Sequence, residues 1–154
     1  METIVSAYEK PREMGLGNLI ADSYRYAVQK AEGPKYEYVH VSFEPLGLIR
    51  ESFQKGRITT EGVFQVLSLG IGKDGIPGYP LMAFYVTGKE LKDILEVEAS
   101  VAPLKKIGAH LQVSGVKFTF NPHRILFDRV TQVSVRNEKG EYEPLDYEKL
   151  YRIC

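Results

Sequence analysis

The residues best suited to bind a ligand lie in the segment Gly47-Leu48-Ile49-Arg50. A glycine directly after a predicted strand permits close approach of the backbone to a ligand. An arginine three residues later offers a planar fork of N–H donors that suits phosphate or a ribose oxygen. The same pattern also fits an ordinary turn that carries a surface arginine. The sequence pattern alone leaves both interpretations open.

Hydrolysis assisted by a metal ion needs several Asp, His or Asn side chains that converge, usually with some ligands close together in sequence. The only histidines are His40, His110 and His123, and none occurs in a His-x-His, Asp-x-His or His-Glu-x-x-His pattern. We predict each to be a partly exposed strand or loop residue. A Gly-x-Ser-x-Gly nucleophile motif is also missing, and Ser114-Gly115 is expected at a hairpin corner. The chain alone is therefore predicted to have no catalytic residue.

The run Gly70 to Gly75 matches a dinucleotide-binding fingerprint, which works only where a strand precedes it and a helix opens at its end. Pro77, Gly78 and Pro80 follow and prevent that helix. We therefore predict a mobile surface loop from Gly70 to Pro80.

Composition excludes several classes of function. The 154 residues carry 20 Lys plus Arg and 20 Asp plus Glu, with the two signs interspersed, so no nucleic-acid or membrane partner is predicted. The apolar runs are too short to span a bilayer, and the chain does not begin like a signal peptide. Cys154 is the only cysteine, which rules out an internal disulfide and an all-cysteine metal site.

The first part of the chain predicts two helices and a strand. Apolar residues recur at three- and four-residue steps, which indicates an amphipathic helix that ends at Gly33-Pro34. Residues Tyr36 to Phe43 alternate like a strand, and Thr59 or Thr60 caps a short helix through about Leu67. The expected apolar stripe of the first helix consists of Leu16, Leu19, Ile20, Tyr24, Ala27, Val28 and Ala31.

The second part predicts one further helix followed by antiparallel strands. Leu81 to Val86 has the composition of a buried strand, and Thr87-Gly88-Lys89-Glu90 is a capping box that begins a helix with Leu91, Ile94 and Leu95 buried. From His110 onward the apolar period is two, and Leu150 to Cys154 continues as a strand. Helices followed by hairpins predict a single α+β domain over residues 1–154. No turn or polar tail ends the strand at Leu150 to Cys154, so an artificial boundary is expected there.

Several segments, in this order, resemble the carboxy-terminal domain of the 5'-nucleotidase and UDP-sugar hydrolase family. The similarity extends from about Lys10 to Cys154, and no single motif is decisive. The segments that carry the resemblance are Leu16-Gly17-Asn18-Leu19-Ile20-Ala21-Asp22, Gly47-Leu48-Ile49-Arg50, Gly56-Arg57-Ile58-Thr59, Val66-Leu67-Ser68-Leu69, Thr87-Gly88-Lys89-Glu90-Leu91, Leu111-Gln112-Val113-Ser114-Gly115-Val116 and Arg129-Val130.

The resemblance implies a substrate-recognition role for the chain. In the family, two divalent metals on an amino-terminal metallophosphoesterase domain hydrolyse nucleotides, and the carboxy-terminal domain holds base and ribose. By analogy, Arg50 and Lys10 fall on substrate-contacting positions, while Gly47 and Leu69 fall within the binding segments. No cofactor is expected in this chain. Its expected partners are the amino-terminal domain and a nucleoside or nucleotide, and the implied location is outside the cytoplasm.

Three positions depart from the family pattern. Pro45 replaces an asparagine that helps to hold the nucleoside, Leu46 replaces a glycine, and Leu69 replaces a base-stacking phenylalanine. The resemblance implies that the last strand of the domain and the family's terminal Gly-Asp-Gly loop, with a second aromatic residue, lie beyond Cys154. Two hypotheses follow: a nucleoside-binding domain, or a degenerate domain kept for structural or protein contacts. A third, an enzyme with an unrelated site, has no motif in its support.

Overall fold

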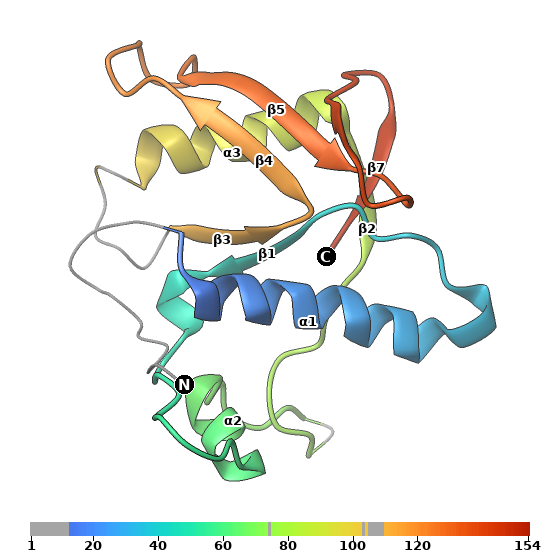
Figure 1. The fold of residues 1–154 in the computed structure, drawn as a ribbon, viewed down its shortest axis with the longest axis vertical. Coiled ribbons are helices and arrows are strands. Elements are labelled where there is room, and N and C mark those ends of the chain that lie inside the picture. The colour runs from blue at the N-terminus through green and yellow to red at the C-terminus, as the bar shows by residue number, and fades with distance from the viewer. Residues whose placement is uncertain (1–12, 74, 103, 105–109) are drawn as a thin grey trace.

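The computed structural model describes residues 13–73, 75–102, 104 and 110–154. These residues form helices and short antiparallel strands (Figure 1), which confirms the predicted α+β class. The elements are α1 (Gly15–Glu32), η1 (Gly33–Lys35), β1 (Ser42–Pro45), η2 (Leu46–Leu48), α2 (Thr60–Val66), β2 (Phe84–Thr87), α3 (Gly88–Val101), β3 (Leu111–Ser114), β4 (Val116–Phe120), β5 (Val130–Arg136), β6 (Tyr142–Pro144) and β7 (Leu150–Ile153).

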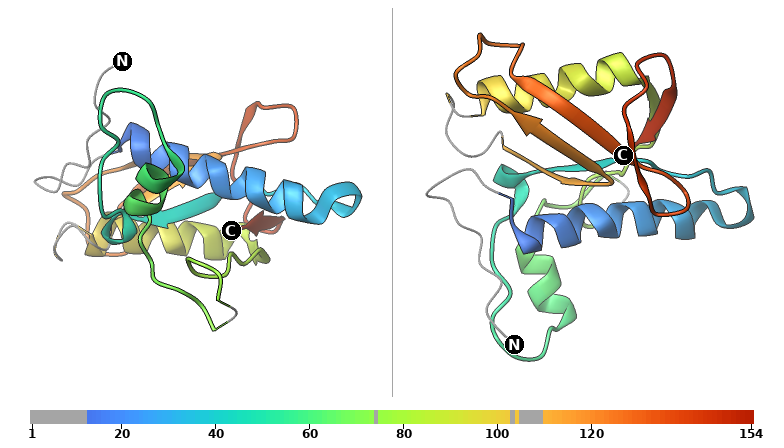
Figure 2. Two further views of the ribbon diagram at one scale, coloured as in Figure 1. Left: turned by 90° about the horizontal axis from the view of Figure 1, so that it is seen from below. Right: turned by 45° about the horizontal axis from the view of Figure 1, so that its top comes forward.

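The strands form three small sheets whose order is β1-β3, β2-β7 and β4-β5-β6. Helix α3 runs along the sheet that contains β4 and β5, while α1 lies beside β1 and β3 (Figure 2). The larger hydrophobic core joins α3 to β2, β4, β5 and β7. A second core lies between the start of α1, η2 and α2. Because α2 and η2 pack in this second core and not in the larger one, they form a distinct end of the molecule.

Helix α1 confirms the predicted amphipathic helix, although its buried stripe is narrower than expected. Leu16, Ile20 and Val28 are buried as predicted, but Leu19 is half exposed. Close packing on β3 explains the shift, because a Cβ atom added to Gly17 would lie 2.2 Å from Gln112 Cγ. The helix ends at Gly33, which adopts a φ of 54°. Ala27 and Ala31, also expected on the stripe, are exposed.

The strand predicted from Tyr36 to Phe43 is wrong in its bounds, because β1 begins only at Ser42. Val39 is fully buried, yet its carbonyl accepts a hydrogen bond from Arg25 Nε (3.0 Å) and not from a neighbouring strand. Val41 forms only an isolated bridge to Ile153. Val39 and Val41 are thus buried at alternate positions, yet neither belongs to a strand.

The buried strand predicted from Leu81 to Val86 is wrong in its start and in most of its burial. Strand β2 begins at Phe84, and Phe84 and Tyr85 are half exposed, whereas Val86 is buried. Among the residues that the structure describes, β2 pairs with β7 alone, in a two-stranded sheet. A sheet of this size buries little of either face, so most of the apolar side chains of β2 remain in contact with solvent.

The turn at Ser114-Gly115 is a corner between two sheets, and the predicted hairpin is wrong. Strand β3 pairs with β1, whereas β4 pairs with β5. Gly115 adopts a φ of 81°, a conformation that favours glycine. The chain can thus leave one sheet and enter the next within one residue. The predicted helix starts are confirmed, with Thr59 capping α2 and a capping box at the start of α3.

Candidate functional site

The segment after β1 forms a short helical turn, η2, that holds Gly47 and Arg50 at the surface. Leu46 N donates a 2.7 Å hydrogen bond to His110 O, which anchors the turn to the residue before β3. Leu46 and Ile49 are fully buried in the second core. With both neighbours directed inward, Gly47 stays half-buried and Arg50 is exposed.

Helix α2 brings Leu69 close to the same segment. Arg50 N donates a 2.8 Å hydrogen bond to Val66 O at the end of α2, and the Val66 side chain enters the second core. Leu69 follows three residues later and is half-buried. Gly47, Arg50 and Leu69 therefore belong to one end of the molecule. Lys10 lies outside the described residues.

The Arg50 guanidinium is available for a ligand. Its side chain is exposed, and no hydrogen bond or ion pair joins it to any other residue in the described part of the chain. An arginine of this kind presents five donors in a planar fork, which matches phosphate and vicinal hydroxyl oxygens. Its neighbour Ile49 is fully buried, so the backbone that carries the guanidinium is held in place.

Two hollows border this end of the molecule. One, of about 350 Å³, lies beside α2 and combines apolar, acidic and basic side chains, and the other, of about 540 Å³, lies along the loop that follows Leu69. The first is lined by Glu51, Ser52, Phe53, Gln54, Arg57, Ile58, Thr59, Glu61, Gly62 and Gln65. Sequence reasoning missed Phe53 in this hollow and Tyr79 in the second, because a single aromatic residue in a loop carries no periodic signal.

The predicted surface loop from Gly70 to Pro80 is confirmed as a loop, and hydrogen bonds within it shape its backbone. Gly72 N donates to Ile76 O (2.8 Å) and Gly78 N donates to Gly70 O (2.9 Å). These two bonds fold the loop back on itself. No helix opens among the described residues of this loop, so they lack dinucleotide-binding geometry.

The side chains of His40 and His110 contact other residues of the fold. His40 Nδ1 accepts a 3.1 Å hydrogen bond from Arg152 N, and burial, followed by the nearby charge of Lys149, lowers the pKa of His40. His110 pairs with Glu98, and His123 is exposed. Within residues 13–73, 75–102, 104 and 110–154, no cluster of three or more His, Cys, Asp or Glu side chains could hold a metal ion.

The departures from the family pattern lie in the same region. Leu46 is part of the second core, so a larger apolar residue there stabilises the turn that carries Arg50. Pro45 is the last residue of β1 and is half-buried, and it has no side-chain donor or acceptor. Leu69 offers apolar contact without an aromatic face.

The arrangement defines an α+β domain that exposes a ligand-accessible arginine and, in its described residues, carries no metal cluster of its own. The family described as "5'-nucleotidase, C-terminal domain" matches residues 3–154. The chain belongs to this family, as its sequence motifs predicted.

Three known proteins illustrate the similarity. An apyrase of Tabanus yao is 30% identical over 149 residues, which are 92% of this chain and 25% of the apyrase. A 5'-nucleotidase-related protein of Glossina morsitans morsitans is 30% identical over 151 residues, which are 94% of this chain and 26% of that protein. The crystal structure of a 5'-nucleotidase precursor from Thermus thermophilus matches 98% of this chain and 27% of that chain, with 33% identity and a TM-score of 0.76. The chain thus spans about a quarter of the length of these relatives.

Proposed function

We propose that this domain recognises the nucleoside part of a nucleotide for a phosphohydrolase whose catalytic metals lie on a separate amino-terminal domain. The observation that carries the proposal is the exposed guanidinium of Arg50, which has no partner among the described residues and is held on a turn beside α2. Membership of the 5'-nucleotidase C-terminal domain family supports the proposal. The relatives also support it, since each is about four times longer than this chain and bears a nucleotidase or apyrase name.

In this proposal the chain binds and orients the substrate but does not break the phosphate ester. Arg50 donates hydrogen bonds to a ribose or phosphate oxygen, and Leu69 contacts one face of the base. Two divalent metal ions on the amino-terminal domain would activate the water that attacks phosphorus. Interaction with that domain, and a location outside the cytoplasm, belong to the same proposal.

A second candidate function is a degenerate domain with a structural or protein-interaction role. Two positions favour it: Pro45 supplies no amide to a nucleoside, and Leu69 supplies no aromatic face. Both losses weaken binding of the base and ribose without any effect on the exposed Arg50. The two functions therefore differ in one measurable property, the affinity of this chain for nucleosides.

Titration of the ¹⁵N-labelled chain with adenosine monophosphate, followed by NMR, tests the proposal. We expect shifts of the backbone amides near Arg50 and Leu69 at millimolar ligand. Arg50→Ala should weaken binding about tenfold or more, since a charge-assisted hydrogen bond contributes roughly 1.5–3 kcal/mol. Lys139→Ala, an exposed residue of the turn between β5 and β6, serves as the matched control. Unchanged spectra at millimolar nucleotide would favour the degenerate domain.

A further inference from the structure

The loop between β4 and β5 presents three consecutive apolar side chains to solvent. Ile125 is 77% exposed, Leu126 47% and Phe127 58%. We call these three residues the apolar tip. The loop protrudes at the end of the molecule opposite α2, as two views agree (Figures 1 and 2). Isolated surface apolar residues are ordinary, but a protruding run of three large ones indicates an interaction surface.

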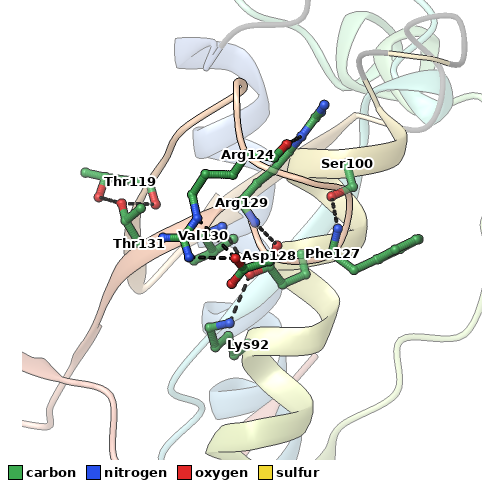
Figure 3. A network of polar contacts seen from close by, with 10 residues as sticks. Lys92, Ser100, Thr119, Arg124, Phe127, Asp128, Arg129, Val130 and Thr131 are labelled. Carbon is green, nitrogen blue, oxygen red and sulfur yellow. Dashed lines mark hydrogen bonds and ion pairs between the residues drawn. The ribbon is translucent and has the colours of Figure 1, made fainter.

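The backbone of this loop is held by buried acceptors on α3. Phe127 N donates to Ser100 Oγ (2.8 Å), while Arg129 N and Val130 N donate to the two carboxylate oxygens of Glu96 (2.8 and 3.0 Å). Glu96 is 1% exposed. These bonds fix Phe127 at a φ of 63°, which is rare for a residue of this size. Figure 3 shows the Phe127 side chain extending away from α3 and from this network.

The charged side chains of the loop are engaged within the protein. Arg124 donates to Asp128 Oδ2 through Nη2 (2.6 Å) and Nε (3.2 Å). Arg129 donates through Nη1 to Ala99 O (3.0 Å). The Arg124–Asp128 pair balances its own charge beside the apolar tip. The loop therefore exposes apolar side chains to solvent, and the charges of Arg124 and Asp128 beside them neutralise each other.

We propose that the apolar tip inserts into the interfacial region of a lipid bilayer. An apolar medium strongly disfavours unpaired backbone groups, and this loop already satisfies most of its N–H groups internally. Besides the bonds to α3, Asp128 N donates to Ile125 O (3.2 Å) and Asn121 N donates to Arg129 O (2.8 Å). A fixed loop also loses little conformational entropy when it binds.

The shape and size of the apolar tip favour a membrane over a protein partner. Three side chains of this size expose on the order of 300 Å², well below the roughly 800 Å² that each partner of a stable protein complex buries. A convex protrusion needs no matching cavity in a bilayer. If the proposed function holds, the Arg50 end faces the catalytic domain, and the apolar tip then points away from that domain.

The sequence analysis predicted no membrane partner, and this inference revises that prediction. Within the described residues, no helix is long and apolar enough to cross a membrane. Hydropathy over about 19 residues detects spanning segments. Three apolar residues between Arg124 and Asp128 do not raise such an average, although their exposure in the structure is clear.

Fluorescence of the full 154-residue chain tests insertion, because the sequence contains no tryptophan. In Phe127→Trp the new indole is the only one. We expect a blue shift of its emission with dioleoyl phosphatidylcholine vesicles, and quenching by brominated lipid. Both effects should persist in high salt, since the interaction is apolar. Phe64→Trp on α2, where the phenylalanine is 45% exposed, is the matched control and should show neither effect.

Vesicle sedimentation of the unlabelled chain tests the same claim without tryptophan. Ile125→Ser and Leu126→Ser should each lower the partition coefficient about tenfold. Ile71→Ser, a comparably exposed isoleucine at a different loop, should leave it unchanged. Absence of vesicle binding by the unsubstituted chain would overturn the proposal. So would a blue shift of Phe127→Trp that depends on protein concentration and needs no lipid, which would assign the apolar tip to a contact between two copies. Neither assay involves nucleotide, so its outcome is independent of the proposed function.

Discussion

The hydroxyl of Tyr24 donates a 2.8 Å hydrogen bond to Oε2 of Glu44, a carboxyl group that is 2% exposed. Glu44 lies on β1, and Tyr24 reaches it from α1. The other carboxyl oxygen, Oε1, is buried and has no partner within the described residues. Burial raises the pKa of Glu44, and the hydrogen bond from Tyr24 only partly offsets this effect. The β1–α1 contact therefore favours the neutral acid.

Glu44 should make the protein less stable as the pH rises. Its pKa is higher in the folded state than the 4.5 of an unperturbed glutamate, so the folded state binds the proton more tightly. Its stabilising contribution is complete below pH 4.5 and is lost as the pH rises through the folded-state value. We expect Glu44→Gln to remove this loss. The slopes of the free energy of unfolding against pH should then differ between the two chains by up to about 1.4 kcal/mol per pH unit. Urea unfolding between about pH 4 and 8 measures it, and parallel pH profiles would contradict the prediction.

Gly115→Ala should strongly destabilise the corner between β3 and β4. A Cβ atom there would lie 1.9 Å from His40 O, and the φ of 81° disfavours any residue with a side chain. Because the clashing atom belongs to the backbone, neither group can move aside without shifting the main chain. We therefore expect a loss of about 3 kcal/mol or more in the free energy of unfolding. Gly140→Ala is the control. It has a similar φ of 87°, but its nearest neighbour is the Arg136 side chain at 3.4 Å, so about 1 kcal/mol is expected. Equal losses would show that the contact with His40 is unimportant.

The capping box of α3 should contribute measurably to stability. Thr87 Oγ1 accepts a 3.2 Å hydrogen bond from Glu90 N, and Glu90 Oε2 accepts one from Thr87 N at 2.7 Å. Thr87→Ala removes the hydroxyl and should cost about 1 kcal/mol in the free energy of unfolding. Thr87→Ser keeps the hydroxyl and should stay within about 0.5 kcal/mol of the original chain. Denaturant midpoints compare the two, and equal midpoints would argue against the cap.

The parts of the fold that could be predicted depend on neighbours in sequence. The capping box at Thr87, the cap at Thr59 and the end of α1 at Gly33 follow from residues within one helical turn of each other. The partners of the strands could not be predicted, because the pairing of Ser42 with Ser114 joins residues 72 positions apart. For the same reason Val39 resembled part of a strand, although a side chain from α1 satisfies its carbonyl.

The candidate functional site was predicted in part, through the family resemblance and not through chemistry visible in the sequence. Arg50 and Leu69 lie at the same end of the molecule because the backbone bond from Arg50 to Val66 joins their segments. Nothing in their spacing indicates that bond. The buried role of Glu96 was also missed, because a glutamate in a helix ordinarily faces solvent. Its carboxylate oxygens accept hydrogen bonds from backbone N–H groups more than 30 positions away, which the sequence does not indicate.

Leu69→Phe should strengthen nucleoside binding if Leu69 borders the base. Leu69 is half-buried at the end of the segment joined to Arg50, so a larger ring there can remain in contact with a ligand. Stacking of a base on an aromatic side chain contributes roughly 1–3 kcal/mol. Because the phenylalanine would stack on only one face of the base, we expect a gain in the lower part of this range. Adenosine affinity, measured by NMR titration, should then be about fivefold to tenfold higher. Leu69→Met is the matched control, since it adds flexible apolar bulk without a π face and should leave the affinity within about twofold. A gain with methionine equal to that with phenylalanine would mean that apolar area alone is limiting. No gain with either residue would remove Leu69 from the site, while Arg50 would remain to be judged by its own alanine variant.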